Sequence, residues 1–231
     1  PNVSPRVKNE RTLVILECHR CPLLVMLLCN PMTNMPNLNL SPGNTPLEPD
    51  ELAQLIPNLA TKGELDEWER KNIIEAHEWA LNPRRVKARD PFTEPYLHEL
   101  HRRMFNHTWK WAGTYRNTEK NIGVLVHEIR NRIPALLGNT RYWVDHQTFP
   151  ADEIAIRFHH ELVGVIQPFP NGNGRHARLH ADVVAVKLDR SEFTWGQNSI
   201  VGTGPAREAY TRALRAADNG DIQELLKFAR S

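Results

Sequence analysis

The sequence has little cysteine, and what it has is confined to one end. Cys18, Cys21 and Cys29 are the three cysteines of the 231-residue chain, and they all precede residue 30. A secreted domain held together by disulfides would carry cysteines along its whole length. Cys18 and Cys21 have the spacing of half a zinc knuckle, but no second ligand pair follows them. The sequence therefore argues against a disulfide framework and favours a cytoplasmic protein.

Long hydrophobic runs and an excess of one charge are also missing. The apolar run Leu23–Leu28 is too short to cross a bilayer, and no small-residue cleavage site follows it, as a secretory signal would require. The formal net charge is only +2, whereas bulk nucleic-acid binding normally needs a clustered basic stripe. We therefore expect neither a membrane partner nor a nucleic-acid partner.

The chain divides into an N-terminal arm and one larger domain. Residues 37–49 are rich in Pro, Asn, Ser and Gly, which is the composition of a linker. Met32 and Met35 lie just before this linker, so the arm is expected to be either disordered or an over-extended start. We place the arm at residues 1–43 and the domain at residues 44–231, which is long enough to bury one good core.

Helical periodicity dominates this domain. Apolar residues recur at helical spacing, and capping residues, prolines or glycines mark the expected helix ends. Thr93, for example, can cap a helix whose first turn holds Glu94 and Pro95. Helices are predicted at residues 50–56, 63–81, 94–105, 128–146, 152–165, 173–188, 205–217 and 222–230.

The helical period breaks between residues 109 and 124. Gly113 and Gly123 lie in this stretch, together with β-branched and aromatic residues. Such a composition is typical of a short β-hairpin or an extended flap. The fold class is therefore predicted to be all-α with one small β-hairpin. The residues that suggest the hairpin are Thr114, Tyr115, Ile122 and Val124.

A glycine-rich turn, Asn171-Gly172-Asn173-Gly174, leads into a predicted helix. Glycines let successive backbone N–H groups point at one anion, and the first N–H groups of a helix are unpaired at the positive end of its dipole. Arg175 and Arg178 lie on one face of that helix and could pair with a polyphosphate. A plain tight turn with solvated arginines is the alternative, and Pro168 and Phe169 before the turn argue against it.

Residues 167–178 resemble the Fic signature, which is His-Pro-Phe-x-(Asp/Glu)-Gly-Asn-Gly-Arg-x-x-Arg. Trp111–Arg116 resembles the start of the Fic flap, while Thr45–Leu47 and Phe158–His160 resemble the branch called mobile mystery protein B. The resemblance spans roughly residues 44–200. It implies an all-helical Fic core that binds ATP with Mg²⁺ and transfers AMP to a hydroxyl side chain of a target protein.

The resemblance also implies roles for individual residues. Gly172, Asn173 and Gly174 would hold the α- and β-phosphates, and Arg175 and Arg178 would pair with the phosphates. Asn171 stands at the acidic position that holds Mg²⁺, so we expect its amide to bind the metal only weakly. The flap would dock the target as an added strand. Its residues are Thr114, Tyr115, Arg116 and Ile122.

Gln167 stands where the family has its catalytic histidine. A carboxamide cannot accept a proton near neutral pH, and losing a general base typically costs about 10²–10⁴-fold in rate. His159, His160 and His180 are close in sequence, but a histidine from another helical turn is not expected to reproduce the geometry of the base. We expect His176 to lie on the helix surface.

A glutamate that pairs with the second arginine of the signature restrains many Fic proteins. Glu75 is the candidate here, with Arg178 as its partner, although Lys71 stands where the family pattern has Ser or Thr. A solvated helix-surface acid is the alternative.

Three functions fit these observations. The first is a protein adenylyltransferase whose transfer step is impaired. The second is a non-catalytic Fic-fold regulator that retains nucleotide or partner binding. The third is a transferase that moves a different phosphate-linked group.

Overall fold

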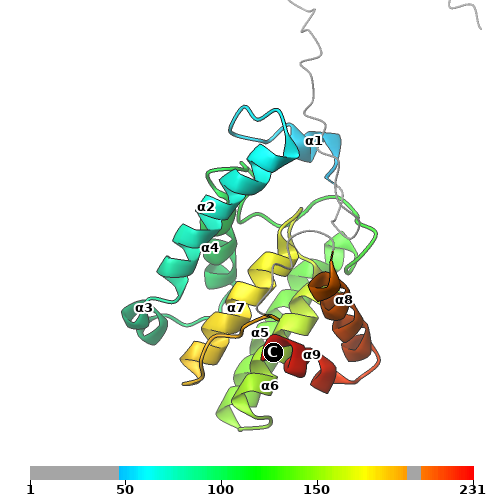
Figure 1. Cartoon of the computed structure of the whole chain (residues 1–231). Coiled ribbons are helices and arrows are strands. Elements are labelled where there is room, and N and C mark those ends of the chain that lie inside the picture. Colours follow the sequence, from blue (N-terminus) through cyan, green and yellow to red (C-terminus); the bar gives the residue numbers. More distant parts are fainter. Residues whose placement is uncertain (1–46, 197–203) are drawn as a thin grey trace, which may run out of the picture. The chain divides into compact units, whose positions relative to one another are not determined.

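A computed structural model describes residues 47–196 and 204–231, which belong to one compact unit, Pro36–Ser231. The arm predicted at residues 1–43 lies outside them. The described residues form helices and no strand, as Figure 1 shows, so the all-α class is confirmed. The helices are α1 (Pro49–Leu52), α2 (Lys62–Ala80), α3 (Pro83–Ala88), α4 (Glu94–Phe105), a 3₁₀-helix (Val126–Glu128), α5 (Ile129–Asp145), α6 (Ala151–His160), a π-helix (Glu161–Ile166), α7 (Asn173–Lys187), α8 (Pro205–Asp218) and α9 (Ile222–Ala229).

Short polar residues begin α2 and α4 where the sequence predicts them. The Thr61 hydroxyl accepts from the Glu64 backbone N–H at 3.3 Å, and the Glu64 carboxylate accepts from the Thr61 N–H at 3.0 Å. Thr93 likewise accepts from the Tyr96 N–H at 3.3 Å. Each cap satisfies N–H groups that the first helical turn leaves unpaired, so these boundaries follow from local sequence.

The first predicted helix, at residues 50–56, is shorter than expected, since α1 ends at Leu52. Leu55 forms an isolated antiparallel bridge with Trp109 instead. Pairing with a distant segment has replaced the last turn of the helix, and local periodicity gives no sign of such a contact.

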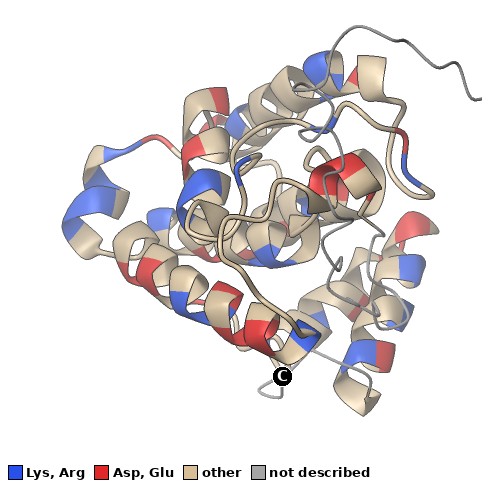
Figure 2. Cartoon of the chain, turned by 90° about the horizontal axis from the view of Figure 1, so that it is seen from above, with Lys and Arg blue, Asp and Glu red and all other residues tan. Residues whose placement is uncertain are grey.

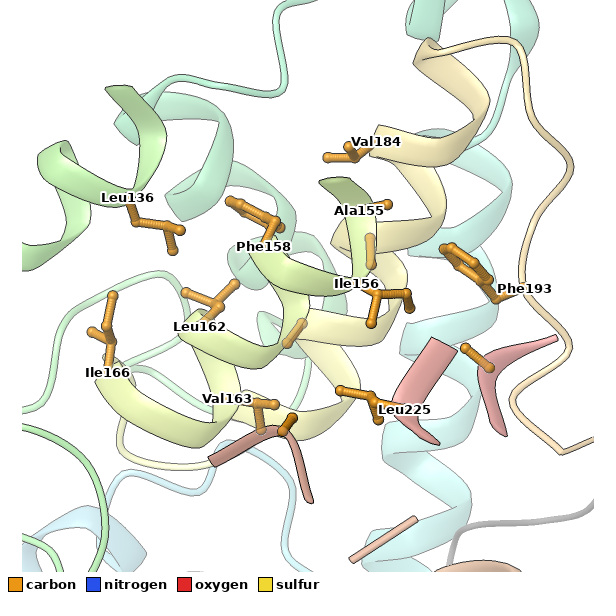
Figure 3. Close-up of a cluster of buried hydrophobic side chains, with 14 of the residues drawn as sticks. Leu136, Ala155, Ile156, Phe158, Leu162, Val163, Ile166, Val184, Phe193 and Leu225 are labelled. Atoms are coloured by element: carbon orange, nitrogen blue, oxygen red, sulfur yellow. The ribbon is translucent and has the colours of Figure 1, made fainter. Parts of the chain in front are cut away.

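Helix α7 lies between two hydrophobic clusters and contributes to both. Ala177, Ala181 and Val184 belong to a cluster built with α5, α6, α8 and α9, part of which is drawn in Figure 3. Leu179 and Val183 belong to a second cluster, built with α2, α4 and the tryptophans that follow α4. A helix that packs against the core on both sides has a fixed position, because each Å² of apolar area removed from water contributes about 25 cal/mol to stability. The N-terminus of α7 is therefore a fixed point in the structure.

Buried histidines attach α7 to the chain around α4. The Nε2–H of His176 donates to the Leu97 carbonyl at 3.1 Å, and that of His180 donates to the Pro91 carbonyl at 2.9 Å. Both rings are fully buried, which holds the pKa of each well below its ordinary value. The expected surface position of His176 is therefore wrong. Its polar ring is buried because a backbone carbonyl takes up its N–H.

The predicted β-hairpin is absent from residues 109–124, which form an extended loop. The buried Arg116 guanidinium takes the place of cross-strand hydrogen bonds. Its Nη1 donates to the Thr118 carbonyl at 3.1 Å, and its Nη2 donates to the Val124 carbonyl. One side chain thus joins the two arms of the loop, and no backbone ladder is needed. The hairpin was predicted from composition, which does not show where an arginine will lie.

A buried glutamate anchors the same loop from outside. Glu51 of α1 accepts from the Thr118 hydroxyl at 2.7 Å and pairs with the Lys120 ammonium at 2.6 Å. The side chains of Glu51 and Lys120 are almost completely buried. A buried pair of this kind fixes geometry, since leaving either charge alone there would be costly.

None of the helices within residues 47–196 and 204–231 combines the length and the apolar composition needed to span a membrane.

Candidate functional site

The glycine-rich turn rests on an aromatic ring. Gly172 has φ +77°, and a Cβ on it would lie 2.5 Å from the Phe105 ring of α4. Only glycine satisfies both demands, because other residues are strained at positive φ and would collide with the ring. Phe105 is completely buried, so the position of the turn is set by the core.

The Asn173 side chain closes the turn. Its Oδ1 accepts from the Phe169 backbone N–H at 2.9 Å, and its Nδ2 donates to the Phe169 carbonyl at 2.8 Å. The side chain of this expected phosphate-binding residue is thus used inside the protein. Its backbone N–H is the group left for a ligand.

Three backbone N–H groups at the start of α7 have no acceptor among the described residues. They belong to Asn173, Gly174 and Arg175, and the first intrahelical bond runs from the His176 N–H to the Gly172 carbonyl at 2.9 Å. Such unpaired groups carry the positive end of the helix dipole. We call the turn and these three groups, residues 171–175, the nest. Its geometry suits an anion with several oxygens.

His101 joins the nest to the loop and was missed by sequence reasoning. Its Nδ1 accepts from the Gly113 N–H at 2.9 Å, so its Nε2 carries the proton and donates to the Asn171 carbonyl at 3.1 Å. The ring stacks on Phe169 with centroids 3.7 Å apart. Burial lowers the His101 pKa to about 3, so the ring is neutral and this pair of bonds is kept.

Arg175 is held by a glutamate that sequence reasoning also missed. Its Nη1 lies 2.5 Å from the buried carboxylate of Glu69 in α2, which also accepts from the Trp109 indole N–H at 2.7 Å. The Arg175 guanidinium lies 4.9 Å from the centre of the Phe105 ring. In the resting protein, therefore, a carboxylate already neutralises one of the two arginines expected to meet phosphate.

Arg178 has a different environment. Its guanidinium lies over the Tyr210 ring, 5.4 Å from the ring centre. Its Nη1 also lies 3.7 Å from the point that a Cβ on Gly174 would occupy. Arg178 thus borders the nest, and no carboxylate of the described residues forms an ion pair with it.

The expected partner of Arg178, Glu75, does not reach it. The Glu75 side chain is 67% exposed, and its carboxylate lies 3.9 Å from the His107 ring. The structure does not bring Glu75 and Arg178 together. Glu69, six residues earlier in α2, is the acid that meets a signature arginine, and that arginine is Arg175.

Gln167 ends a π-helix in a left-handed conformation. Its backbone N–H donates to the Leu162 carbonyl, five residues back, at 3.0 Å, and its φ is +52°. Its side-chain Nε2 donates to the Val163 carbonyl at 2.5 Å. Positive φ at a residue other than glycine, and a π turn, are both enriched at functional sites. The carboxamide N–H is thus directed back into its own helix.

The loop is tied to the backbone around Gln167. The Arg116 Nε donates to the Gln167 carbonyl at 2.8 Å, and the Arg116 N–H donates to the Pro168 carbonyl at 2.9 Å. A Cβ on Gly123 would lie 2.7 Å from the Gln167 Cβ, so this glycine makes room for the glutamine. Thr114 and Ile122 are exposed, and the Tyr115 hydroxyl donates to Glu94 at 2.8 Å.

A hollow of about 650 Å³ lies beside the loop. The loop residues Gly113–Asn117 line it together with parts of α1, α4 and α5, and Pro170 is the part of the turn that reaches it. A volume of this size is ordinary for a small-molecule or peptide site.

The described residues contain no group of three or more His, Cys, Asp or Glu that could hold a metal ion. Asn171, the expected Mg²⁺ ligand, uses its Oδ1 to accept from the neighbouring Gly172 N–H at 2.6 Å. This donor set fits a metal poorly, since it offers one amide oxygen that is already engaged.

Part of the chain matches a known protein family. Residues 91–185 match the model of the Fic/DOC family, and this segment includes α4, the loop, the nest and most of α7. Through this region the chain is similar to the Fic/DOC family. Proteins named protein adenylyltransferase Fic are 26% identical over 152 residues in Nematostella vectensis and 27% identical over 135 residues in Drosophila grimshawi.

These alignments cover 64% and 56% of this chain but only 34% and 26% of the relatives, so the chain spans about a third of their length or less. Solved structures support the fold. The BepC protein of Bartonella tribocorum, solved with bound AMPPNP, has a TM-score of 0.60 at 17% identity, over 79% of this chain and 97% of that one. A Fic domain containing signaling protein from Bacteroides thetaiotaomicron has a TM-score of 0.56 at 19% identity, over 75% and 69%.

Proposed function

We propose that this chain binds ATP at the nest and belongs to the protein adenylyltransferases, with a transfer step that Gln167 slows strongly. The observation that carries the proposal is the nest itself, where three backbone N–H groups have no acceptor among the described residues and the Arg178 guanidinium lies close to Gly174. The names of the curated relatives support the reaction class, and the AMPPNP bound to a structural relative supports the ligand class.

The transfer reaction defines what Gln167 would have to do. The oxygen of a target hydroxyl forms a bond to the α-phosphorus of ATP, the bond from that phosphorus to the bridging oxygen breaks, and pyrophosphate leaves. The hydroxyl proton must go to a base as the bond forms. The carboxamide oxygen of Gln167 can accept a hydrogen bond from the hydroxyl, but it cannot take the proton.

Roles for the other residues follow from their positions. The backbone N–H groups of Asn173, Gly174 and Arg175 would bind phosphate oxygens, with Gly172 shaping the turn and Arg178 pairing with the phosphates. Arg175 would do so only after sharing or leaving Glu69. Any Mg²⁺ would arrive with the nucleotide and be held by its phosphates and water, because the Asn171 Oδ1 already accepts from the Gly172 N–H. Glu75 remains a weaker candidate for restraint than Glu69, and a cytoplasmic location remains part of the proposal.

The target protein is proposed to dock at the loop, residues 113–124. Exposed Thr114 and Ile122 offer contacts there, and the 650 Å³ hollow beside Tyr115 and Arg116 offers room for a side chain. Docking would depend on an extended loop held by Arg116 and Glu51 rather than on a preformed hairpin.

One observation favours a second candidate, a non-catalytic Fic-fold regulator. The Gln167 Nε2 donates to the Val163 carbonyl, so one of its two amide N–H hydrogens is used inside the fold. Such a module would keep nucleotide or partner binding without transfer.

Intact-mass analysis with Mg·ATP separates these candidates, using the natural chain beside its Gln167→His variant and a Gln167→Asn control. We expect a slow or undetectable AMP mass gain in the natural chain and a gain in the histidine variant that is faster by roughly 10²-fold or more. ATP binding without labelling in either chain would favour the regulator. A mass gain other than that of AMP would indicate a different transferred group, and equal AMP transfer by the natural chain would overturn the account of Gln167.

A further inference from the structure

Helix α3 presents a dense group of positive charges. Arg84, Arg85, Lys87 and Arg89 fall within six residues, all four are exposed, and no acidic residue lies among them. Val86 is the buried residue of this helix and attaches it to the core. The basic side chains are therefore exposed, and the blue turns of α3 in Figure 2 show where they lie along the chain. We call these four residues the α3 basic surface.

These charges are not neutralised within the protein. No carboxylate among residues 47–196 and 204–231 forms an ion pair with any of the four. Arg70, Arg141 and Arg157, by contrast, each pair with an acid. Like charges placed close together repel one another. An external anion that binds the α3 basic surface would reduce this repulsion, which favours its binding.

Stacking on a tryptophan holds two of the guanidinium groups in place. Arg85 and Arg89 lie over the Trp79 ring, 5.8 and 4.8 Å from its centre, and Arg103 of α4 lies over it at 4.3 Å. A stacked guanidinium keeps the N–H groups at its edge available for carboxylate. These arginines therefore lose less freedom on binding than mobile surface side chains would.

The helix itself is also fixed. The Lys187 ammonium at the end of α7 donates to the carbonyls of Val86, Lys87 and Arg89, each at 3.0 Å. It thereby caps the C-terminus of α3 and joins it to the central helix of the fold. The α3 basic surface is a rigid feature, although α3 is short.

A hollow of about 260 Å³ adjoins this surface. Ala88, Phe92 and Val144 give it an apolar side. The rest of its wall is charged and consists of Arg89, Lys187, Asp145 and the Arg141–Asp90 ion pair. The hollow is small for a drug-sized ligand and suits a single apolar side chain. The hollow can therefore select a ligand by shape, in addition to the attraction that the positive charges exert on any anion.

We propose that the α3 basic surface docks an acidic segment of a partner protein, with one apolar side chain of that segment in the hollow. An acidic peptide matches both features, since its carboxylates meet the guanidinium forks and its apolar residue fills the apolar wall. A nucleic acid matches less well, because the charge is confined to one short helix and the whole chain carries only +2. The interaction is independent of the nucleotide site.

The experiment is a fluorescence-anisotropy titration with a labelled Glu-rich peptide that contains one central Leu. The test variant combines Arg84→Gln, Arg85→Gln and Lys87→Gln. The matched control combines Arg212→Gln, Arg215→Gln and Lys227→Gln, which removes the same charge from exposed positions on α8 and α9. We expect the test variant to raise the Kd roughly tenfold and the control to change it less than about twofold.

A second variant tests the hollow without touching the charges. Ala88→Trp should fill the hollow and weaken binding of the Leu-containing peptide. It should have little effect on the affinity of the same peptide carrying Gly in place of Leu. The proposal is overturned if the natural chain does not bind the peptide at low salt, or if the control variant loses as much affinity for the peptide as the test variant. It is also overturned if a single-stranded oligonucleotide of equal charge binds more tightly than the peptide at the same surface. Equal melting temperatures of all variants confirm that the fold is kept.

Discussion

The nest and the loop meet at Gln167 and Pro168, yet they are held by opposite kinds of force. The nest is shaped by apolar packing and neutral hydrogen bonds, with Gly172 against the Phe105 ring and Asn173 closing the turn. The loop is shaped by buried charge, through the Arg116 guanidinium and the Glu51–Lys120 pair. The turn of the nest is therefore positioned without buried charge, whereas the loop depends on it.

The difference suggests a division of work. A wall built from backbone and aromatic rings keeps its N–H groups in place before a ligand arrives, which favours binding of a fixed chemical group. A wall built from a buried guanidinium holds a loop without a backbone ladder, so the loop edge stays free for a partner. Changes that affect only packing or only buried charge should therefore distinguish the contribution of the nest from that of the loop.

Acid is expected to have the largest effect, and it acts on buried histidines, of which His101 bonds to the nest. Burial lowers the pKa of His101 and His159 to about 3 and that of His180 to about 4, against an ordinary value of 6.5, and it also lowers the pKa of His176. Between pH 6.5 and about 4 the unfolded chain binds a proton on each histidine and the folded chain does not, so stability falls as the pH falls.

Asp182 opposes this trend, because burial raises its pKa to about 7 and the folded chain then binds the extra proton. Four histidines outweigh one aspartate, so the free energy of unfolding should fall steeply as the pH falls from about 6.5 toward 4. Denaturant titrations at several pH values between 7 and 5 measure this slope. A flat profile would show that these rings are not buried as described.

Removing the clamp of the loop is the next largest change. Arg116→Met leaves three carbonyls without their donor, and we expect a loss of about 3 kcal/mol. The control is Arg132→Met, which removes an exposed arginine whose ion pair with Glu128 is 3.8 Å long and should cost less than about 0.5 kcal/mol. Chemical denaturation measures both, and equal losses would remove the argument for a clamp.

Filling the turn of the nest should cost less. Gly172→Ala places a methyl group against the Phe105 ring at positive φ, which we expect to destabilise the fold by about 2 kcal/mol. Gly63→Ala is the matched control, since a Cβ there meets nothing within 4 Å. Thermal melting of both variants decides the matter, and an unchanged Gly172→Ala protein would mean that the turn is not packed on the ring.

The smallest effect concerns the balance of charge at the nest. Glu69→Gln removes the carboxylate that neutralises Arg175 while keeping an acceptor for Trp109. Arg175 is then free to meet phosphate, so we expect ATP to bind roughly tenfold more tightly. Glu67→Gln, which affects only an exposed pair with Arg70, should leave the affinity unchanged. Weaker ATP binding by Glu69→Gln would show instead that Glu69 supports the site.

These two walls also explain how much the sequence can reveal. The turn of the nest is predictable because its own closure is local: Asn173 bonds to Phe169, four residues away. Its support by Phe105 and His101 comes from distant segments and had no local signal. The loop is not predictable, because Arg116 reaches Gln167 across 51 positions and Thr118 reaches Glu51 across 67. A hairpin was predicted from composition where a long-range side-chain clamp exists.

The fold shows the same pattern. The capped helices α2 and α4, and the long buried helix α7, begin and end close to their predicted bounds. The short α3 and the π-helix were not predicted, because a six-residue helix has little periodicity and a π turn differs from α-helix by a residue per turn. Glu69 and His101 had no local signal, and only their distant partners identify them.

The most direct test of the nest as a phosphate site is calorimetric titration of ATP into three chains. They are the natural protein, Gly174→Val, and the control Gly138→Val. A Cβ on Gly174 would lie in ordinary contact with Arg178 and Val163, while one on Gly138 meets nothing within 4 Å, so both variants should fold. We predict that ATP binds the natural chain and Gly138→Val alike, and binds Gly174→Val at least about tenfold more weakly. Absence of ATP binding by the natural chain, or equal binding by Gly174→Val, would contradict the account.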